Sequence, residues 1–164
     1  MTIRFGILTL SDRSSRGERA DSSGPALADL IQAEGWSVVI QSLLPDEEYA
    51  IRETLISWAD SGELDVILTT GGTGFAPRDV TPEATRAVIE REAPGLAEAM
   101  RAASLKITPH AMLSRIVTGI RKKTLIINLP GSPKGAVENL QVITAVLPHA
   151  IQLLREDSAS EASH

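Results

Sequence analysis

A glycine-rich segment, Thr69-Thr70-Gly71-Gly72-Thr73-Gly74, directly follows a short apolar run and is the first candidate for chemistry in this sequence. Three of its last four residues lack a Cβ, so successive backbone N–H groups can turn inward and form a nest for an anion such as phosphate. No Lys-Ser or Lys-Thr follows the glycines, and Pro77 stands where the dinucleotide fingerprint has its third glycine. The segment is therefore neither of those two motifs. A tight glycine turn without a ligand is the alternative.

Two carboxylates and a guanidinium accompany this nest. Arg78 and Asp79 lie within five residues of it, just before a helix start at Thr81, and Asp46 follows another strand-like run. Arginine can grip phosphate through two hydrogen bonds, and aspartate can hold a hydrated Mg²⁺ that shields a triphosphate. The alternatives are that Asp79 and Thr81 only cap a helix, that Arg78 is a surface charge, and that Asp46 is a helix N-cap.

Two further polar turns could bind parts of a substrate. Pro130-Gly131-Ser132-Pro133-Lys134 combines a rigid turn, a helix N-terminus capped by Ser132, and one cation. It suits a second phosphate, or it only connects a strand to a helix. Ser11-Asp12-Arg13 could pair a carboxylate with the N–H edge of a heterocycle, or it could bond the neighbouring backbone as an Asx turn.

Other reaction classes lack the residues they need. The chain has no cysteine, which excludes disulfides, thiolate nucleophiles and Cys-ligated zinc or iron–sulfur centres. His110, His149 and His164 are too far apart in sequence to suggest a zinc site. No serine sits in a nucleophile elbow, so no Ser-His-Asp arrangement can be argued. Phosphoryl chemistry fits best.

Composition limits the size, partners and location of the protein. With 164 residues, 43% of them hydrophobic, the chain suits one domain with a full core. A net charge of -5 argues against nucleic-acid binding, and the basic cluster at residues 121–123 is expected to be a solvated turn. No run approaches the ~18 apolar residues that span a membrane, and no signal peptide precedes the first strand. We expect a soluble, cytoplasmic protein.

Strands and helices alternate along the chain and must position these residues. The predicted strands are residues 3–10, 36–44, 65–70, 116–120 and 124–128, the last two forming a hairpin across residues 121–123. The predicted helices are residues 23–35, 46–62, a segment opening at Thr81, 96–105, and 132–154 with a bend or break near Pro148.

This alternation predicts a doubly wound, three-layer α/β fold with a mostly parallel sheet and one antiparallel hairpin. We expect one domain over residues 1–155 and a disordered C-terminal tail over residues 156–164. Ligands of such folds bind at the carboxyl ends of the strands. The polar loops at residues 11–17, 71–79 and 130–134 should therefore converge on one edge, together with Asp46.

Six sequence blocks, in order, resemble one known family. They are Thr9-Leu10-Ser11-Asp12-Arg13, Leu44-Pro45-Asp46-Glu47, the glycine segment, residues 78–85, Leu113-Ser114-Arg115, and residues 128–134. Together they resemble the molybdopterin adenylyltransferases and the related domains of gephyrin and its plant counterpart. The resemblance runs from about Ile3 to Leu154, and its specificity comes from the combination, since each block alone is weak.

The resemblance implies a homotrimer that transfers AMP from ATP to the terminal phosphate of molybdopterin, releasing pyrophosphate with the help of Mg²⁺. It implies catalytic, metal-binding roles for Asp46 and Asp79, and a downstream molybdenum-insertion protein as partner. The implied substrate-binding residues are Ser11, Asp12, Gly71, Gly72, Thr73, Gly74, Arg78, Thr81, Ser114, Pro130, Gly131, Ser132 and Lys134.

Two rival functions stay open on the sequence. The first is a pterin- or nucleotide-binding module that carries or scaffolds a cofactor without turnover, as the receptor-anchoring role of gephyrin suggests. The second is a phosphohydrolase of the same fold that acts on a dinucleotide such as ADP-ribose. Pyrophosphate release from ATP in the presence of molybdopterin would separate the transferase from both.

Overall fold

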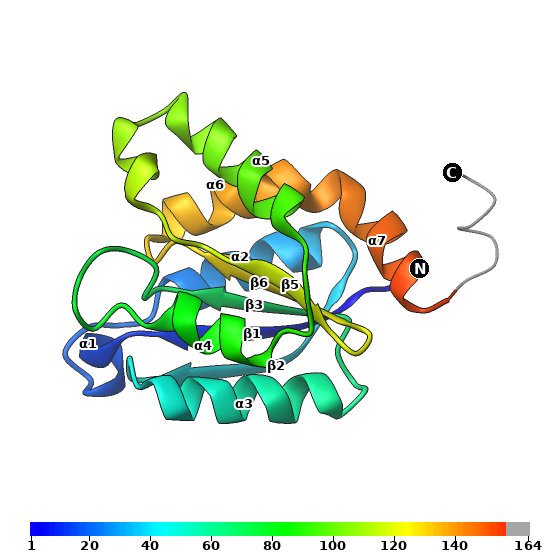
Figure 1. Ribbon diagram of the computed structural model, residues 1–164, viewed down its shortest axis with the longest axis horizontal. Coiled ribbons are helices and arrows are strands. Elements are labelled where there is room, and N and C mark those ends of the chain that lie inside the picture. The colour runs from blue at the N-terminus through cyan, green and yellow to red at the C-terminus, as the bar shows by residue number, and fades with distance from the viewer. Residues whose placement is uncertain (157–164) are drawn as a thin grey trace.

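One six-stranded sheet runs through the protein, a computed structural model that describes residues 1–156 (Figure 1). The strand order is β2-β1-β3-β6-β5-β4. Strands β2, β1, β3 and β6 are mutually parallel, whereas β5 runs antiparallel to β6 and β4 antiparallel to β5. The strands are β1 Arg4–Leu10, β2 Ser37–Leu44, β3 Val66–Thr70, β4 Arg91–Glu92, β5 Thr118–Arg121 and β6 Thr124–Leu129.

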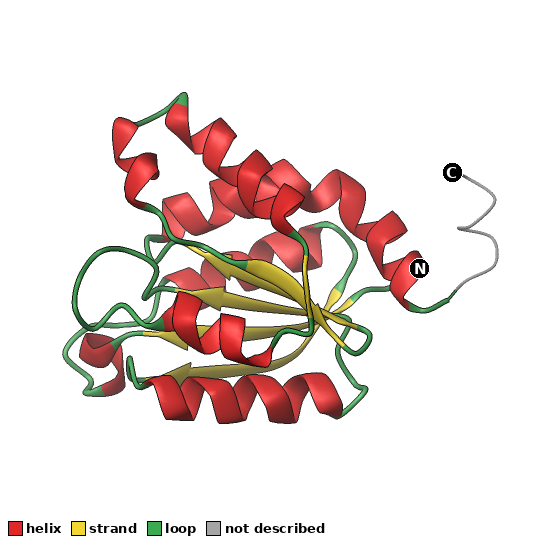
Figure 2. Ribbon diagram, viewed as in Figure 1, coloured by secondary structure: helices red, strands yellow, loops and turns green. Residues whose placement is uncertain are grey.

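Helices cover both faces of this sheet, which makes three layers (Figure 2). One face packs against α2 Ser23–Ala33, α5 Pro94–Leu105, α6 Pro133–Ile143 and α7 Leu147–Leu154. The other packs against α3 Glu48–Asp60 and α4 Thr81–Val88. Successive residues of β3 alternate between the two cores, with Val66 and Leu68 in the first and Ile67 in the second. Burial on both faces explains why this strand has no charged residue and carries three aliphatic residues followed by two threonines.

The predicted fold class is confirmed, including the antiparallel hairpin of β5 and β6. Lys122 occupies the hairpin turn with a positive φ of 51°, while Arg121 belongs to β5 and pairs with Asp60. Elements that were not predicted are the short helix α1 Asp12–Ser15, the edge strand β4, and the 3-10 helices η1 Pro109–Leu113 and η2 Thr144–Val146. The last predicted helix is divided by η2 into α6 and α7.

The cap predictions for two helices are wrong. Helix α3 begins at Glu48 with Glu47 at its N-cap, so Asp46 lies one residue too early to cap it. Helix α4 has Val80 at its N-cap and no side-chain cap, so neither Asp79 nor Thr81 serves there. Both aspartates are thus available for another role. Of the predicted tail, Glu156 ends the described chain, and residues 157–164 lie outside the described residues.

The strand order has a switch point beside β1. The chain passes from β1 through α2 to β2 on one side, and then returns through α3 to β3 on the other side. The connections after β1 and β3 therefore lead away from each other and leave a crevice at the carboxyl ends of these strands. The loops gather at that end of the sheet, at the left of Figure 2.

No helix in the described part of the chain is long and apolar enough to cross a membrane.

At the opposite end of the sheet, a buried carboxylate links the first strand to the last helix. Asp65, with a side chain only 4% exposed, accepts hydrogen bonds from the Arg4 backbone N–H and from the guanidinium groups of Arg4 and Arg155. Burial alone would raise the pKa of this carboxyl, but the bonds from the two arginines outweigh it and the pKa lies below its ordinary value. The carboxylate thus ties the end of α7 to the start of β1.

We predict that Asp65→Asn lowers the free energy of unfolding by about 2–3 kcal/mol, because it removes a buried charge from two guanidinium partners. Urea denaturation at neutral pH measures this. Since the folded pKa is depressed, the contribution is present above about pH 4 and is lost as the pH falls below it. Asp60→Asn, which acts on a more exposed ion pair, is the control and should cost less than 1 kcal/mol, roughly. Equal losses in both variants would contradict a special role for Asp65.

Candidate functional site

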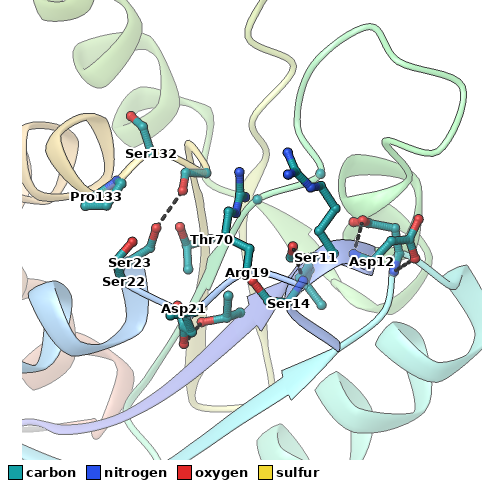
Figure 3. Close-up of a pocket in the computed structure, with 18 of the residues that line it drawn as sticks. Ser11, Asp12, Ser14, Arg19, Asp21, Ser22, Ser23, Thr70, Ser132 and Pro133 are labelled. Carbon is teal, nitrogen blue, oxygen red and sulfur yellow. Dashed lines mark hydrogen bonds between the residues drawn. The ribbon is translucent and has the colours of Figure 1, made fainter. Parts of the chain in front are cut away.

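A cleft of about 550 Å³ opens at the carboxyl ends of β1 and β3. Its wall contains the end of β1 with α1, the start of α2, the glycine segment after β3, and the turn before α6 (Figure 3). The predicted residues that line it are Ser11, Asp12, Asp46, Gly71, Gly72, Asp79, Gly131 and Ser132. The predicted convergence of three polar loops and Asp46 is therefore confirmed.

Gly71 and Gly72 turn the chain sharply as it leaves β3. Their φ angles are 103° and 69°, a region that favours glycine. A Cβ on Gly71 would collide with the Leu10 carbonyl, and one on Gly72 would collide with the Thr81 hydroxyl and lie 3.0 Å from Asp46 Oδ1. Both glycines are therefore required by close packing as well as by the turn itself.

The carbonyls of this turn point into the protein. The Thr81 hydroxyl donates to the Gly71 carbonyl at 2.9 Å, and the Thr81 N–H donates to the Gly72 carbonyl at 3.1 Å. Thr81 is fully buried, so it anchors the turn and does not line the cleft. In the described part of the chain, no acceptor is bonded to the N–H groups of Gly72, Thr73 or Gly74. This is the unpaired donor set that an anion nest needs.

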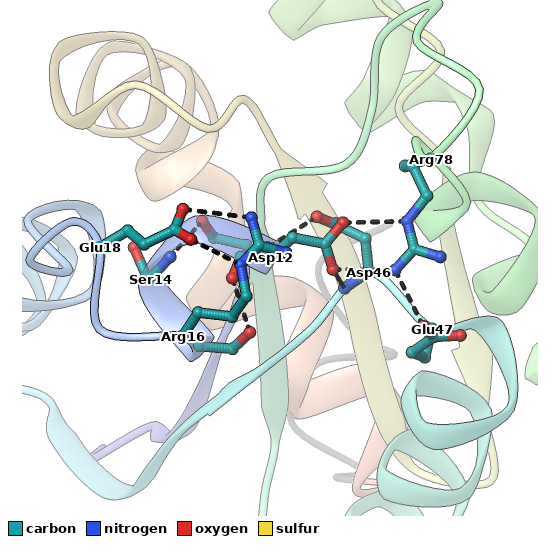
Figure 4. Close-up of polar contacts among 9 residues, drawn as sticks. Asp12, Ser14, Arg16, Glu18, Asp46, Glu47 and Arg78 are labelled. Carbon is teal, nitrogen blue, oxygen red and sulfur yellow. Dashed lines mark hydrogen bonds and ion pairs between the residues drawn. The ribbon is translucent and has the colours of Figure 1, made fainter.

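Asp12 and Asp46 bind each other's backbone across the mouths of β1 and β2. The Asp12 N–H donates to Asp46 Oδ2 and the Asp46 N–H donates to Asp12 Oδ1, each at 3.0 Å (Figure 4). Arg78 then donates twice to the Asp12 carboxylate, at 2.9 Å for each bond, and once to Glu47. Both carboxylate oxygens of Asp12 thus already accept hydrogen bonds from protein groups. The Ser11 hydroxyl likewise accepts from the Ser14 N–H and caps α1.

The second oxygen of Asp46 has no partner among the described residues. Asp46 Oδ1 is buried and accepts no hydrogen bond there. Burial raises the pKa of this carboxyl, and the charges of Asp12 and Asp79 add to the effect. A buried, unpaired carboxylate oxygen is costly, and it calls for a ligand that the protein itself does not supply.

Asp79 brings a second carboxylate to the cleft. Its Oδ2 accepts from the Ala76 N–H at 3.0 Å, and its own N–H donates to the Ala76 carbonyl at 2.9 Å. No group of three or more potential metal ligands exists among residues 1–156. Two carboxylates without a third ligand suit Mg²⁺, which keeps several waters and shares substrate phosphates, better than they suit a metal that needs an all-protein cage.

The cations of the cleft are not those that the sequence suggested. Arg78 is paired with Asp12 and Glu47 outside the cleft wall, and Lys134 is 83% exposed beside Glu138. Arg13 and Arg19 line the cleft instead, from α1 and the segment that follows it. Figure 3 shows the Arg19 side chain between Thr70 and Ser11. Arg19 escaped notice because nothing in its local sequence shows that residues 16–22 fold back over the cleft.

The turn before α6 is held by hydroxyl groups. The Thr70 hydroxyl donates to the Pro130 carbonyl at 2.7 Å, and the Ser23 hydroxyl donates to the Gly131 carbonyl at 2.5 Å. Ser132 is the predicted N-cap and accepts from the Gly135 N–H at 3.1 Å. The N-terminus of this eleven-residue helix therefore faces the cleft, where its dipole favours negative charge.

A second cavity of about 300 Å³ lies on the other side of the glycine segment. Thr73, Gly74, Ser114 and Pro130 line it, together with side chains of α5, η1 and α6, and it shares Ser132 with the cleft. The Ser114 hydroxyl is buried there without a hydrogen-bond partner among the described residues. Apart from Arg78, Thr81 and Lys134, which line neither cavity, the predicted site residues thus divide between two cavities that meet at one turn.

Comparisons with known proteins agree with this geometry. Residues 6–149 match the family described as a probable molybdopterin binding domain. The molybdenum cofactor synthesis protein cinnamon of Drosophila melanogaster is 50% identical over 157 residues, which are 95% of this chain and 26% of that protein. The chain thus spans about a quarter of the length of cinnamon.

Two further relatives are similar over nearly their whole length. The molybdopterin adenylyltransferase of Escherichia coli K12 is 44% identical over 167 residues, covering 93% of this chain and 86% of that protein. The solved structure of the molybdopterin biosynthesis enzyme MoaB from Thermus thermophilus superposes with a TM-score of 0.89 at 52% identity, covering 95% of this chain and 98% of that one. The resemblance that the sequence blocks indicated is confirmed, and the chain belongs to the molybdopterin-binding domain family.

Proposed function

We propose that this protein is a molybdopterin adenylyltransferase of molybdenum cofactor biosynthesis, which transfers AMP from ATP to the terminal phosphate of molybdopterin. The observation that carries the proposal is the unpaired, buried Asp46 Oδ1 beside a nest of unpaired N–H groups, both within the described chain. The carboxylate oxygen can bind a metal cation and the N–H groups can bind phosphate oxygens. Together they suit a phosphate chain that carries a metal ion.

The residues present fit Mg²⁺. Asp46 and Asp79 would hold it, with Asp46 Oδ1 supplying an oxygen that has no partner within residues 1–156. The ion neutralises charge on the triphosphate when it is bound. The raised pKa of Asp46 also favours this role, because a bound cation offsets the burial and the repulsion from neighbouring carboxylates that cause it.

The protein's own contribution is to align two anions. The Gly72 N–H, the N-terminus of α6, and the side chains of Arg13 and Arg19 provide the positive potential around the cleft. Thr73 and Gly74 carry the nest on to the second cavity. A terminal phosphate oxygen of molybdopterin attacks the α-phosphorus of ATP, the bond to the bridging oxygen of the β-phosphate breaks, and pyrophosphate leaves with that electron pair. Positioning and charge stabilisation supply most of such catalysis.

Two substrates require two places, and the two cavities provide them. They meet at Ser132 and are separated by the glycine segment, so a phosphate on the nest can be approached from either side. Ile107, Ala111 and Leu113 give the second cavity an apolar part, and polar side chains border it, among them Ser114, whose hydroxyl has no partner in the described chain. We therefore assign a heterocyclic ring to the second cavity.

Asp46→Asn should abolish adenylyl transfer and spare the fold. The raised pKa means that the ionised carboxylate opposes folding as the pH rises through that pKa, so removing the charge should leave the free energy of unfolding at pH 7 unchanged or higher. Pyrophosphate release with ATP, Mg²⁺ and molybdopterin, beside urea denaturation, tests both parts. Near-normal turnover, or a stability loss of more than about 1 kcal/mol, would contradict the assignment.

Arg19→Ala should raise the KM for one of the two anionic substrates by about tenfold, because it removes a cation that lines the cleft. Lys134→Ala is the matched comparison, because Lys134 lies in the first turn of α6 but outside the cleft, and the KM values of this variant should stay within about twofold. Steady-state kinetics with each substrate varied in turn distinguishes them. Equal effects of the two variants would show that general charge, and not the position of Arg19, governs binding.

For the assembly, we propose a homotrimer whose product passes to a downstream molybdenum-insertion protein. Exposed apolar side chains near η1, with Ile107 64% and Met112 65% exposed, provide surface for contacts between copies. Sedimentation equilibrium at micromolar concentration should give three times the chain mass of 17.5 kDa, and a Met112→Glu variant should shift the distribution towards monomer. A wild-type protein that sediments only as a monomer would refute the trimer.

A further inference from the structure

Arg115 lies outside both cavities but binds the segment that connects them. We infer that Arg115 is a positioning residue, whose guanidinium holds residues 74–79 so that the Asp79 carboxylate faces the metal-bound nucleotide. The inference rests on the proposed function for the identity of that ligand. It assigns a role to a residue whose position in the sequence, beside Ser114, gave no reason to connect it with Asp79.

Arg115 bonds two carbonyls of this segment and the carbonyl of Thr73 just before it. Its backbone N–H donates to the Thr73 carbonyl at 2.9 Å, its Nε donates to the Gly74 carbonyl at 2.8 Å, and its Nη2 donates to the Asp79 carbonyl at 2.8 Å. In a trans peptide the N–H points opposite to the carbonyl of the same unit. Holding the Thr73 carbonyl therefore aims the Gly74 N–H away from Arg115, but this bond comes from the backbone and persists in any variant that is not proline. The arginine side chain itself adds the bonds to the Gly74 and Asp79 carbonyls.

Polar bonds alone can hold this segment. Residues 75–78 are all exposed, Phe75 to 67%, and none of them belongs to either hydrophobic core of the described chain. Within the loop, Asp79 and Ala76 bond each other, and Arg78 reaches Asp12 at the far side. Arg115 supplies the bonds at both ends of the loop, at Gly74 and at Asp79, and so fixes where Asp79 stands.

Glu83 orients the guanidinium of Arg115. Its carboxylate accepts from Nη1 at 2.7 Å and from Nη2 at 3.2 Å, and it stands in the first turn of α4, which follows the loop. This ion pair is partly exposed, with side chains 35% and 45% exposed, so it contributes little to stability by itself. The planar guanidinium matters more, because it bonds Glu83 and two loop carbonyls at the same time, and a lysine ammonium cannot reproduce this set of bonds.

Arg121 provides a matched control. It also makes two bonds to one carboxylate, Asp60, and one bond to a backbone carbonyl, that of Val88, but it does so at the other end of the sheet. A purely structural role for Arg115 predicts that Arg115→Lys and Arg121→Lys behave alike. A positioning role predicts that only Arg115→Lys changes metal–nucleotide binding.

The test measures Mn²⁺ binding by electron paramagnetic resonance in the presence of α,β-methylene-ATP, whose α–β bridge cannot break. Arg115→Lys should weaken Mn²⁺ binding about tenfold or more, as is usual when a residue that orients a metal ligand is changed. Amide hydrogen exchange of the free protein should also become faster over residues 74–79. Arg121→Lys should change neither quantity. Glu83→Gln, which keeps Arg115, should also weaken Mn²⁺ binding and speed amide exchange over residues 74–79. This variant takes the place of Arg115→Lys in the test if Arg115→Lys does not fold.

Equal Mn²⁺ affinities in the Arg115→Lys and Arg121→Lys proteins would overturn the inference, as would a wild-type protein that binds no Mn²⁺ with this nucleotide. The proposed reaction is judged separately. Normal pyrophosphate release by the wild type with equal affinities in both variants would refute the role of Arg115 alone. Conversely, a selective loss in Arg115→Lys, in a protein that releases no pyrophosphate with molybdopterin, would refute the transfer reaction and support the positioning role.

Discussion

The direction of the peptide planes after β3 is the constraint on which the site depends. Two consecutive glycines with positive φ turn the Gly71 and Gly72 carbonyls inward, where Thr81 binds them, and leave the following N–H groups facing outward. With a side chain at either position, the chain would collide with Leu10 or Thr81. Everything else in the cleft is arranged around this turn, since the acids proposed to bind metal and the helix N-terminus are useful only beside a bound anion.

The acidic groups of the cleft are divided between structure and binding. Asp12 is neutralised by Arg78 and bound to the Asp46 backbone, so its pKa is lowered, mainly by the hydrogen bonds from Arg78. Asp46 receives one backbone bond and keeps one oxygen unpaired within the described chain, so burial raises its pKa. The pKa values of these two aspartates, which bind each other's backbone, are thus shifted in opposite directions. The difference arises because one faces a guanidinium and the other faces the cleft.

Local pattern predicted much of this structure. Apolar periodicity located the strands of the parallel sheet, and the strand order placed the three polar loops at one edge. The N-cap at Ser132 was predicted correctly because a serine–proline pair at a helix start acts locally. The hydrogen bonds of Asp46 and Arg78 were not predicted. Their partners lie 34 and 66 residues away along the chain, at Asp12, and no spacing rule contains such contacts. The edge strand β4 was missed because only two residues form it.

The contacts of Asp65 with Arg4 and Arg155 affect how this domain can be joined to other polypeptide segments. Arg155 binds both Asp65 and the Thr2 carbonyl, at 3.2 Å for the latter, so the first strand and the last helix meet at one pole (Figure 1). The cleft lies at the other pole, beyond the far ends of the same strands. The first residues of the chain and Glu156, where the described structure ends, therefore both lie away from the cleft. This geometry suits a domain that forms part of a longer protein, as the matching region is about a quarter of cinnamon, because neighbouring segments need not obstruct the cleft.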